Sequence, residues 1–328
     1  MRIAVLTSGG VAPGINAAVR SVAHVAFHRG WEVLGVADGY NGLLDGRLSF
    51  LSRTDLDGTM QQGGSVLGTA RSAEFADGEG QRKAYEQLQR AEVDGLVVIG
   101  GEGSLAGGMS LAALGMPVIG VPATIDNDIS GTDMAVGVDT ALNTAVEAMD
   151  RIKDTATSHG RAHVVKVLGR NCGYLALMAA ISGDAEAALV PEFETSPEAL
   201  LRLLKLAYDR GKQHFVVVVA EGAQLSAEDL AGYINEAEDT YKTNLTELGH
   251  IQSGGKPTAF DRVLASRLGA AAVEALADGE SSMMTGLKGG EVSLTPISEA
   301  LNEQRPLDPG MYRLAGILAG LPGEPDRA

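Results

Sequence analysis

Two turns of this chain carry side chains that could do chemistry, and each turn directly follows an apolar run typical of a β-strand. Residues 100–104 (GGEGS) come after the run 96–99, and residues 124–128 (TIDND) come after the run 118–121. A glycine turn at the start of a helix exposes backbone N–H groups to an anion such as phosphate. In the second turn, two carboxylates one residue apart could anchor magnesium and deprotonate an attacking hydroxyl. The combination predicts phosphoryl transfer.

Each turn also has an ordinary structural interpretation. A lone GGxGS sequence is more often a tight turn or a helix cap, and a lone Asp-x-Asp is usually a solvated loop. The chemical interpretation therefore depends on the two turns occurring together, after neighbouring strands.

The composition is that of a globular chain without a preference for polyanions. At 328 residues, of which 45% are hydrophobic, the chain is long enough for two domains or one large one. Its net charge of −16 argues against nucleic acid and anionic membrane surfaces as partners. The one cysteine, Cys172, excludes an internal disulfide and suits a reducing cytoplasm. A strand is predicted directly after Met1 and no run approaches ~20 apolar residues, so we expect neither a signal peptide nor a membrane span.

The order of predicted elements indicates an α/β fold. Apolar strands alternate with helices, a pattern typical of βαβ units with parallel sheets. Strands are predicted over residues 3–6, 31–37, 96–99, 118–121, 162–168, 188–190, 215–220 and 245–251. Helices are predicted over residues 16–28, 139–159, 196–209 and 259–277, with another after the loop 169–173.

A further glycine-rich loop, residues 7–14 (TSGGVAPG), lies between the first strand and the first helix. It is also compatible with phosphate. It is not a Walker A loop, because GxxxxGK[ST] occurs nowhere in the chain. Its spacing does not fit the dinucleotide fingerprint either, which argues against NAD.

The sequences of the two turns resemble motifs of the phosphofructokinase family. GGEGS and PATIDNDISGTD are similar to the family's GGDGS and PGTIDNDIxGTD, and the resemblance spans nearly the whole chain. It implies two doubly wound domains with largely parallel sheets. The nucleotide-binding domain would comprise residues 1–137 and 251–303, and the sugar-phosphate-binding domain residues 138–250 and 304–328. The resemblance also implies Mg²⁺ as cofactor, ATP and a sugar phosphate as substrates, a homotetramer and a cytoplasmic location.

The resemblance assigns catalytic roles around the acidic turn. Asp126 would be the base that takes the proton from the sugar hydroxyl, and Asp128 would orient the acceptor or the metal. Thr124 and Arg170 would stabilise charge on the moving phosphoryl group. Glu102 stands where the family has an aspartate near magnesium, and its extra methylene keeps the charge but displaces it.

On the nucleotide side, the resemblance assigns Gly10, Tyr40, Arg71, Gly101, Glu102, Gly103 and Ser104. Arg71 ends a segment similar to the family's GGTxLGSAR and would contact the ATP phosphates. Val11 replaces a family aspartate. Ala76 replaces a family arginine, and the loss of that positive charge predicts weaker nucleotide binding. Gly103 and Ala123 occupy positions where pyrophosphate users carry aspartate and lysine. Small residues there leave room for adenosine and the α-phosphate, so we expect ATP as the phosphoryl donor.

On the acceptor side, the resemblance assigns Thr124, Asp126, Arg161, Leu168, Gly169, Arg170, Glu221, Asn244, His250 and Ser253. Arg161 would reach the 6-phosphate bound by a neighbouring subunit. Asn244 and Ser253 replace two arginines that bind this phosphate in the family. Lys242 or Lys256 could compensate, and the alternative is that both are ordinary solvated side chains.

The family's effector site is also partly matched. Its residues correspond to Arg20, Arg53, Lys153, Glu186, Arg210 and Lys212, with Glu186 on the metal side. His24 and Gln213 replace basic residues. Each residue alone could be a surface charge, but the set predicts a site for an anionic effector.

Three functions are consistent with these residues. The leading prediction is ATP-dependent phosphorylation of fructose 6-phosphate at its 1-hydroxyl, which gives fructose 1,6-bisphosphate in glycolysis. The alternatives are a kinase of the same fold with another sugar or sugar-phosphate acceptor, and a catalytically weak paralogue that regulates a partner. The intact acidic turn and Arg170 argue against the last alternative, whereas Val11, Ala76 and Glu102 favour it.

Overall fold

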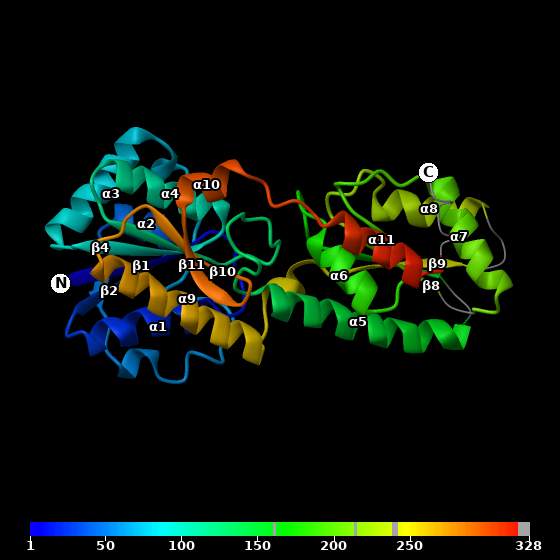
Figure 1. Cartoon of the computed structure of the whole chain (residues 1–328), viewed down its shortest axis with the longest axis horizontal. Helices are drawn as coiled ribbons and strands as arrows, with labels where there is room; N and C mark the ends of the chain where they lie inside the picture. Colours follow the sequence, from blue (N-terminus) through cyan, green and yellow to red (C-terminus); the bar gives the residue numbers. More distant parts are fainter. Residues whose placement is uncertain (160–161, 213–214, 238–241, 321–328) are drawn as a thin grey trace. The chain divides into compact units, whose positions relative to one another are not determined.

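The computed structural model describes residues 1–159, 162–212, 215–237 and 242–320, which form two compact units (Figure 1). Unit 1 comprises Met1–Ile125, Ile129–Thr140 and Ser253–Arg305. Unit 2 comprises Asp126–Asp128, Ala141–Gln252 and the described residues from Pro306 onward. This division differs from the predicted one mainly at Asp126–Asp128, because these residues pack with unit 2 rather than with the strand that precedes them.

Unit 1 is built on a sheet that, over the described residues, has seven strands in the order β11-β10-β5-β4-β1-β2-β3. The strands are β1 (Arg2–Ser8), β2 (Glu32–Val36), β3 (Leu48–Phe50), β4 (Gly95–Gly100), β5 (Val118–Pro122), β10 (Met283–Lys288) and β11 (Glu291–Pro296). The two edge strands, β3 and β11, are antiparallel to their neighbours, and the other pairs are parallel.

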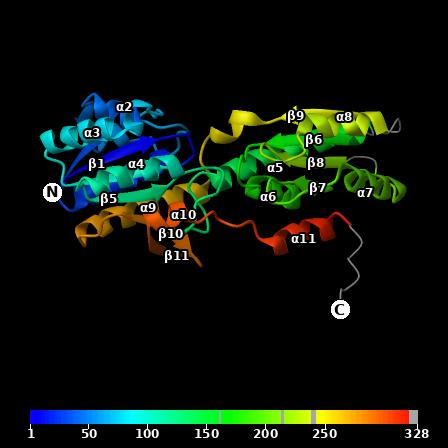
Figure 2. The same cartoon turned by 90° about the horizontal axis from the view of Figure 1, so that it is seen from above.

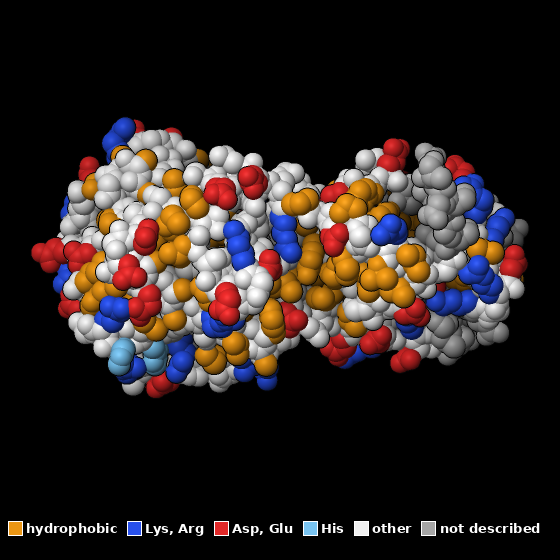
Figure 3. All heavy atoms as spheres, in the orientation of Figure 1, with side chains coloured by type: hydrophobic (Ala, Val, Ile, Leu, Met, Phe, Trp, Pro, Cys, Tyr) orange, Lys and Arg blue, Asp and Glu red, His pale blue; other side chains and the backbone are white. Residues whose placement is uncertain are grey.

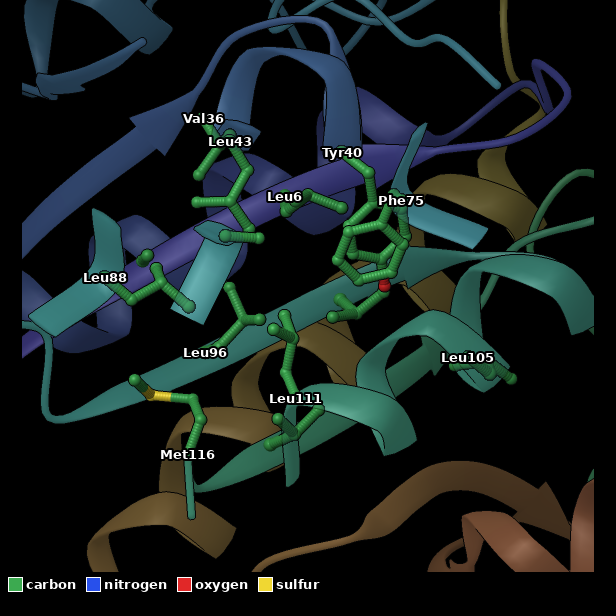
Figure 4. Packing of buried hydrophobic residues seen from close by; sticks show 14 of the residues in the cluster. Leu6, Val36, Tyr40, Leu43, Phe75, Leu88, Leu96, Leu105, Leu111 and Met116 are labelled. Atoms are coloured by element: carbon green, nitrogen blue, oxygen red, sulfur yellow. The ribbon is translucent and has the colours of Figure 1, made fainter. Parts of the chain in front are cut away.

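Helices cover both faces of this sheet. They are α1 (Ile15–His28), α2 (Gly39–Leu44), α3 (Gly78–Arg90), α4 (Glu102–Ala113), α9 (Ala259–Ala277) and α10 (Ile297–Asn302). In Figure 1, α1 and α9 lie below the strands of unit 1, and α3, α4 and α10 lie above them. Because the central strands are buried on both faces, they are continuous apolar runs. Figure 4 shows part of the core on the α3–α4 face, including Leu6, Leu96 and Leu111.

One buried carboxylate joins the starts of α9 and of α5 (Val138–His159). Asp261, in the first turn of α9, is fully buried. It accepts hydrogen bonds from the N–H of Gly137 at 2.9 Å, and from the N–H and hydroxyl of Thr140 at 2.8 and 2.5 Å. The carboxylate therefore satisfies N–H groups that the start of α5 would otherwise leave without partners.

Unit 2 contains, among the residues described, a four-stranded parallel sheet in the order β7-β8-β6-β9. Its strands are β6 (Ala162–Val167), β7 (Ala187–Leu189), β8 (Phe215–Ala220) and β9 (Thr243–Glu247). Its helices are α6 (Tyr174–Ser182), α7 (Pro197–Asp209), α8 (Ala227–Ala237), α11 (Pro309–Leu318) and the greater part of α5.

Alternate residues of the unit 2 strands supply two separate cores. Val165 and Val218 pack with residues of α5, α6 and α11. Val164 and Val217, their neighbours in sequence, pack on the other face with residues of α7 and α8. This alternation is the period of two expected of a strand, and Figure 2 shows α8 on one side of the sheet and α6 and α11 on the other.

The predicted α/β fold with largely parallel sheets is confirmed. One predicted element is only partly confirmed: residues 245–247 belong to β9, but the strand ends at Glu247 rather than at residue 251, and Gly249–Ser253 is a 3₁₀ helix. Gly249 has φ 51°, a left-handed conformation that ends the extended chain. Within the described parts of the chain, no helix is both long and apolar enough to cross a membrane.

Candidate active site

The two glycine-rich loops of unit 1 leave adjacent parallel strands at the same edge of the sheet. Ser8, the last residue of β1, lies in register with Gly100, the last residue of β4. From there α1 leads to β2 on one side, and α4 leads to β5 on the other, so the strand order reverses between β1 and β4. Open α/β sheets bind ligands at the carboxyl ends of the strands flanking such a reversal.

Both loops leave open space where a phosphate could approach the backbone. A Cβ added to Gly10 or Gly103 would meet no atom within 4 Å, and both residues are exposed. Glu102 is exposed at the first position of α4, where the helix N-terminus favours negative ligands. A Cβ added to Gly101 would lie 3.7 Å from Cβ of Thr124, so the glycine turn and this threonine are neighbours.

Ser104 supports these loops from inside. Its side chain is buried, and its hydroxyl donates to the Ser8 carbonyl at 2.8 Å. Its N–H donates to the Gly101 carbonyl at 3.0 Å. Both donors of Ser104 are thus used within the protein, and its hydroxyl joins the ends of β1 and β4. The contact of Ser104 with a nucleotide stays a prediction.

Tyr40 also has a supporting position, at the start of α2. It is 4% exposed, and its hydroxyl donates to the Ser104 carbonyl at 2.6 Å. Its ring stacks on Phe75 with 4.0 Å between centroids (Figure 4). Burial raises the pKa of its hydroxyl. The side chain is therefore enclosed by the protein in this structure, and the nucleotide contact assigned to Tyr40 stays a prediction.

The loop that leads to Arg71 is fixed by a residue that sequence reasoning missed. Asn16, in the first turn of α1, is 1% exposed. It accepts from the N–H of Val66 at 2.8 Å and donates to the carbonyl of Gln62 at 3.1 Å. Arg71 itself is exposed. The sequence feature that could have revealed this role is an asparagine just after a glycine-rich loop. Its side-chain amide can both donate and accept hydrogen bonds, which suits it to hold a neighbouring loop.

In unit 2, the acidic turn lies with residues from the ends of β6 and β8. The electrostatic neighbours of Asp126 are Asp128, Glu221 and Arg170. Burial raises the pKa of Asp126 to about 6, the negative charges of Asp128 and Glu221 act in the same direction, and Arg170 opposes them. The structure therefore brings three of the predicted site residues together around the carboxyl group of a fourth, Asp126.

The second carboxylate of the turn is also perturbed. Burial raises the pKa of Asp128. Its Oδ1 atom is buried and has no hydrogen-bond partner among the described residues. A buried acceptor oxygen of this kind is available to a ligand that brings its own donor or positive charge.

Arg170 and Glu221 are held by backbone contacts between the loops that follow β6 and β8. The N–H of Glu221 donates to the Val167 carbonyl at 2.9 Å, and the N–H of Gly222 donates to the Gly169 carbonyl at 3.0 Å. A Cβ on Gly222 would overlap the Arg170 carbonyl, so only glycine allows this approach. The Arg170 guanidinium lies 3.5 Å from the Glu221 carboxylate and remains 70% exposed, which leaves it able to contact a substrate.

The remaining acceptor residues are more scattered. Asn244 is half-buried on β9, and His250 is exposed in the 3₁₀ helix of unit 2. Ser253 is half-buried and belongs to unit 1. Lys242 and Lys256 are both exposed. Arg161 lies outside the described residues.

The predicted effector residues fall into two groups. In unit 1, Arg53 contacts Nδ1 of His24 at 2.9 Å. Burial, followed by the positive charges of Arg20 and Arg53, lowers the pKa of His24. Arg20 and Arg53 therefore make this group basic, whereas the lowered pKa of His24 favours the neutral form of its side chain.

In unit 2, the predicted effector carboxylate is already paired. Glu186 is 2% exposed and forms an ion pair with Lys212, which also lies 3.7 Å from Asp184. Lys153 donates to the Asp184 carbonyl at 2.9 Å, and Arg210 is exposed. Burial alone would lower the pKa of Lys212, but the hydrogen bond with Glu186 raises it overall. Gln213 lies outside the described residues.

On the face of the molecule shown in Figure 3, Asp and Glu side chains are interspersed with Lys and Arg side chains. Across the described residues, no group of three or more His, Cys, Asp and Glu side chains is arranged to hold a metal ion.

The chain matches known proteins over nearly its whole length. A family model described as Phosphofructokinase matches residues 2–276. The chain is 49% identical over 320 residues to "ATP-dependent 6-phosphofructokinase 1" of Thermus thermophilus, covering 97% of this chain and 99% of the relative. It is 47% identical over 318 residues to "ATP-dependent 6-phosphofructokinase" of Listeria monocytogenes, with the same coverage.

Solved structures show the same fold. Phosphofructokinase from Saccharomyces cerevisiae superposes with a TM-score of 0.87 at 36% identity, over 92% of this chain and 45% of the yeast chain. Pyrophosphate-dependent phosphofructokinase from Marinobacter aquaeolei superposes with a TM-score of 0.83 at 23% identity, over 94% of this chain and 85% of that one, a likeness of fold. The match of nearly the whole sequence identifies this chain as a member of the phosphofructokinase family.

Proposed function

We propose that this chain transfers the γ-phosphoryl group of ATP to the 1-hydroxyl of fructose 6-phosphate. The observation that carries the proposal is the environment of Asp126. A carboxyl group with a pKa of about 6 beside an arginine is suited to act as a general base near neutral pH. The relatives named ATP-dependent 6-phosphofructokinase support both the phosphoryl donor and the acceptor.

In this proposal, the nucleotide binds unit 1. Its phosphates lie against the open backbone of Gly10 and Gly103, and the N-terminus of α4 attracts their negative charge. Arg71 adds a positive charge from the loop that Asn16 anchors. Open space at Gly103 accommodates the nucleotide, which supports ATP over pyrophosphate as the donor.

The acceptor binds unit 2. Asp126 takes the proton from the 1-hydroxyl, which makes that oxygen a better nucleophile. Arg170 balances negative charge on the phosphoryl group as it moves, and Thr124 donates a hydrogen bond to the same group. Glu221, held beside Arg170, accepts hydrogen bonds from sugar hydroxyls.

The residues present fit magnesium carried on the ATP phosphates. Glu102 is an exposed carboxylate beside the open glycine turn, and Mg²⁺ is commonly held by one or two carboxylates together with substrate phosphates. When bound, the ion neutralises negative charge on the phosphates. Glu102 would hold and orient it.

A second candidate function keeps the chemistry and changes the acceptor. Asn244 and Ser253 offer neutral groups where the family has arginines, so the phosphate-binding part of the acceptor site is less basic. This favours another sugar or sugar phosphate with weaker demands for positive charge.

Three further features belong to the proposal. We place the enzyme in the cytoplasm, in line with its single cysteine, Cys172.

We expect a homotetramer, because Arg161 serves an active site only if a neighbouring subunit supplies it. Light scattering that finds an active monomer would contradict this assembly. We also assign Arg20, Arg53, Lys153, Glu186, Arg210 and Lys212 to an anionic effector site.

A coupled assay tests the proposed function. The purified chain is supplied with Mg-ATP and a panel of free and phosphorylated sugars, and kcat/KM is measured for each. We expect the highest kcat/KM with fructose 6-phosphate, and loss of that activity in Asp126→Asn. A higher value with another sugar establishes the second candidate, and no turnover with any sugar at catalytic enzyme concentrations would support the regulatory paralogue.

A further inference from the structure

Gln252 is a fully buried polar residue to which the proposed mechanism gives no role. It lies in the 3₁₀ helix Gly249–Ser253, two residues after His250, and has 0% exposure. Its Oε1 atom accepts a hydrogen bond from the N–H of Leu168 at 2.9 Å. Its Nε2 atom is buried and has no hydrogen-bond partner among the residues described. The contact with Leu168 is therefore the hydrogen bond that this buried amide makes in the described structure.

This hydrogen bond continues the pairing of β6 with β9 after β9 has ended. The ladder runs to the pair of Lys166 with Glu247, and the N–H of Leu248 then donates to the Lys166 carbonyl at 3.0 Å. The chain turns away at Gly249, so no backbone carbonyl of a continued strand faces the N–H of Leu168. The Gln252 side chain supplies that acceptor instead.

The loop after β6 is consequently held from both sides. On the β8 side, the backbone of Gly222 donates to the Gly169 carbonyl at 3.0 Å. On the β9 side, Gln252 holds Leu168, the residue before Gly169. Arg170 is the next residue of the loop, and its long exposed side chain is only as well placed as the backbone from which it extends.

We propose that Gln252 is a positioning residue for phosphoryl transfer, which fixes the Leu168–Gly169–Arg170 loop against the 3₁₀ helix that carries His250. Through one side chain it sets the separation of two segments that bear proposed acceptor contacts. The inference rests on the proposed function, since it assigns Gln252 to the acceptor half of that site.

Two variants isolate the hydrogen bond. Gln252→Met has a similar length and volume but removes the acceptor for the N–H of Leu168. Gln252→Glu keeps an acceptor oxygen at the same distance along the side chain. We expect Gln252→Met to lower kcat/KM for fructose 6-phosphate by about 10- to 100-fold, the order expected of a small misplacement of a catalytic group. KM for ATP should stay within about twofold of wild type, and Gln252→Glu should recover most of the loss.

A core variant separates positioning from general stability. Leu200→Ala removes packing from a core residue of α7 that is 2% exposed and belongs to the cluster between the sheet, α7 and α8. It should lower Tm without changing kcat/KM for the folded enzyme. A purely structural role for Gln252 predicts the same pattern for Gln252→Met, and that result would overturn the proposal.

Three outcomes separate the role of Gln252 from the proposed function. If Gln252→Glu is as impaired as Gln252→Met, the Leu168 hydrogen bond is not what matters, and the proposal fails. If wild type does not turn over fructose 6-phosphate at all, it is the proposed function that fails. An active wild type with a fully active Gln252→Met variant overturns the role of Gln252 alone.

Discussion

Replacing Asp126 by asparagine should have opposite effects on activity and stability. The pKa of Asp126 is raised from 3.8 to about 6, chiefly by burial and then by Asp128 and Glu221. Because the folded pKa lies above the unfolded one, the carboxyl group favours folding only while it is protonated, and this contribution is lost as pH rises from about 4 through about 6. At pH 7 the ionised carboxylate therefore destabilises the fold.

The magnitude follows from the size of the shift. About two pKa units at 1.36 kcal/mol each give an upper bound of about 3 kcal/mol, and partial exposure of the group reduces it to about 1–3 kcal/mol. Asp126→Asn should be more stable than wild type by this amount at pH 7, with the difference narrowing toward pH 4. Turnover should fall at least ~10²-fold through loss of the base, and wild-type kcat/KM should itself decline below about pH 6.

Urea denaturation at several pH values, together with steady-state kinetics, measures both effects. Asp150→Asn, the same chemical change at an exposed position on α5, serves as the matched control and should change neither quantity. If Asp126→Asn is no more stable than wild type at pH 7, the inference that the ionised Asp126 carboxylate destabilises the fold is refuted. A variant that retains a tenth of wild-type turnover, with chemistry rate-limiting, would remove Asp126 from the role of base.

Three further predictions concern the phosphoryl donor, the acceptor and the fold. Open space at Gly103 should give a higher kcat/KM with ATP than with pyrophosphate, and the reverse order in a coupled assay would show the size argument to be wrong. The double change Asn244→Arg and Ser253→Arg should lower KM for fructose 6-phosphate by about 10²-fold without altering KM for ATP, since each charge-assisted contact contributes about 1.5–3 kcal/mol. Wild type that already saturates at low micromolar sugar phosphate would contradict it. Asp261→Ala should lower the free energy of unfolding by about 3 kcal/mol, because it leaves buried N–H groups at the start of α5 unsatisfied; an unchanged urea midpoint would mean that water replaces the carboxylate.

The central strands could be predicted from the sequence because they are buried on both faces. Residues 96–99 and 118–121 are uninterrupted apolar runs, and both form strands within about a residue of the predicted limits. The predicted strand 245–251 extended too far, because the pattern of apolar and polar residues there does not reveal the conformation of Gly249. A single residue with positive φ ended a strand that the side chains alone would have allowed to continue.

The site could be predicted in composition but not in geometry. The local sequence motif identified Asp126. The pKa of this residue, however, depends first on its burial and also on Glu221 and Arg170, which the fold brings from the ends of two other strands. Tyr40 and Ser104 show what a motif leaves open. Only the packed structure shows that their hydroxyl groups donate to carbonyl groups of the protein itself.

The order of synthesis gives the sheet of unit 1 a vulnerable interval. β5 pairs with β10 through Met283 and Ile119, so one edge of β5 has no partner until the ribosome has made a segment about 160 residues further along. At the usual 5–20 residues per second this takes roughly 10–30 s. During that time an apolar strand edge of the nascent chain is open to pairing with other chains, which is a recognised route to aggregation. Translation pauses or truncations before residue 296 should therefore yield insoluble product, even though every residue of the glycine turns and the acidic turn has already been made.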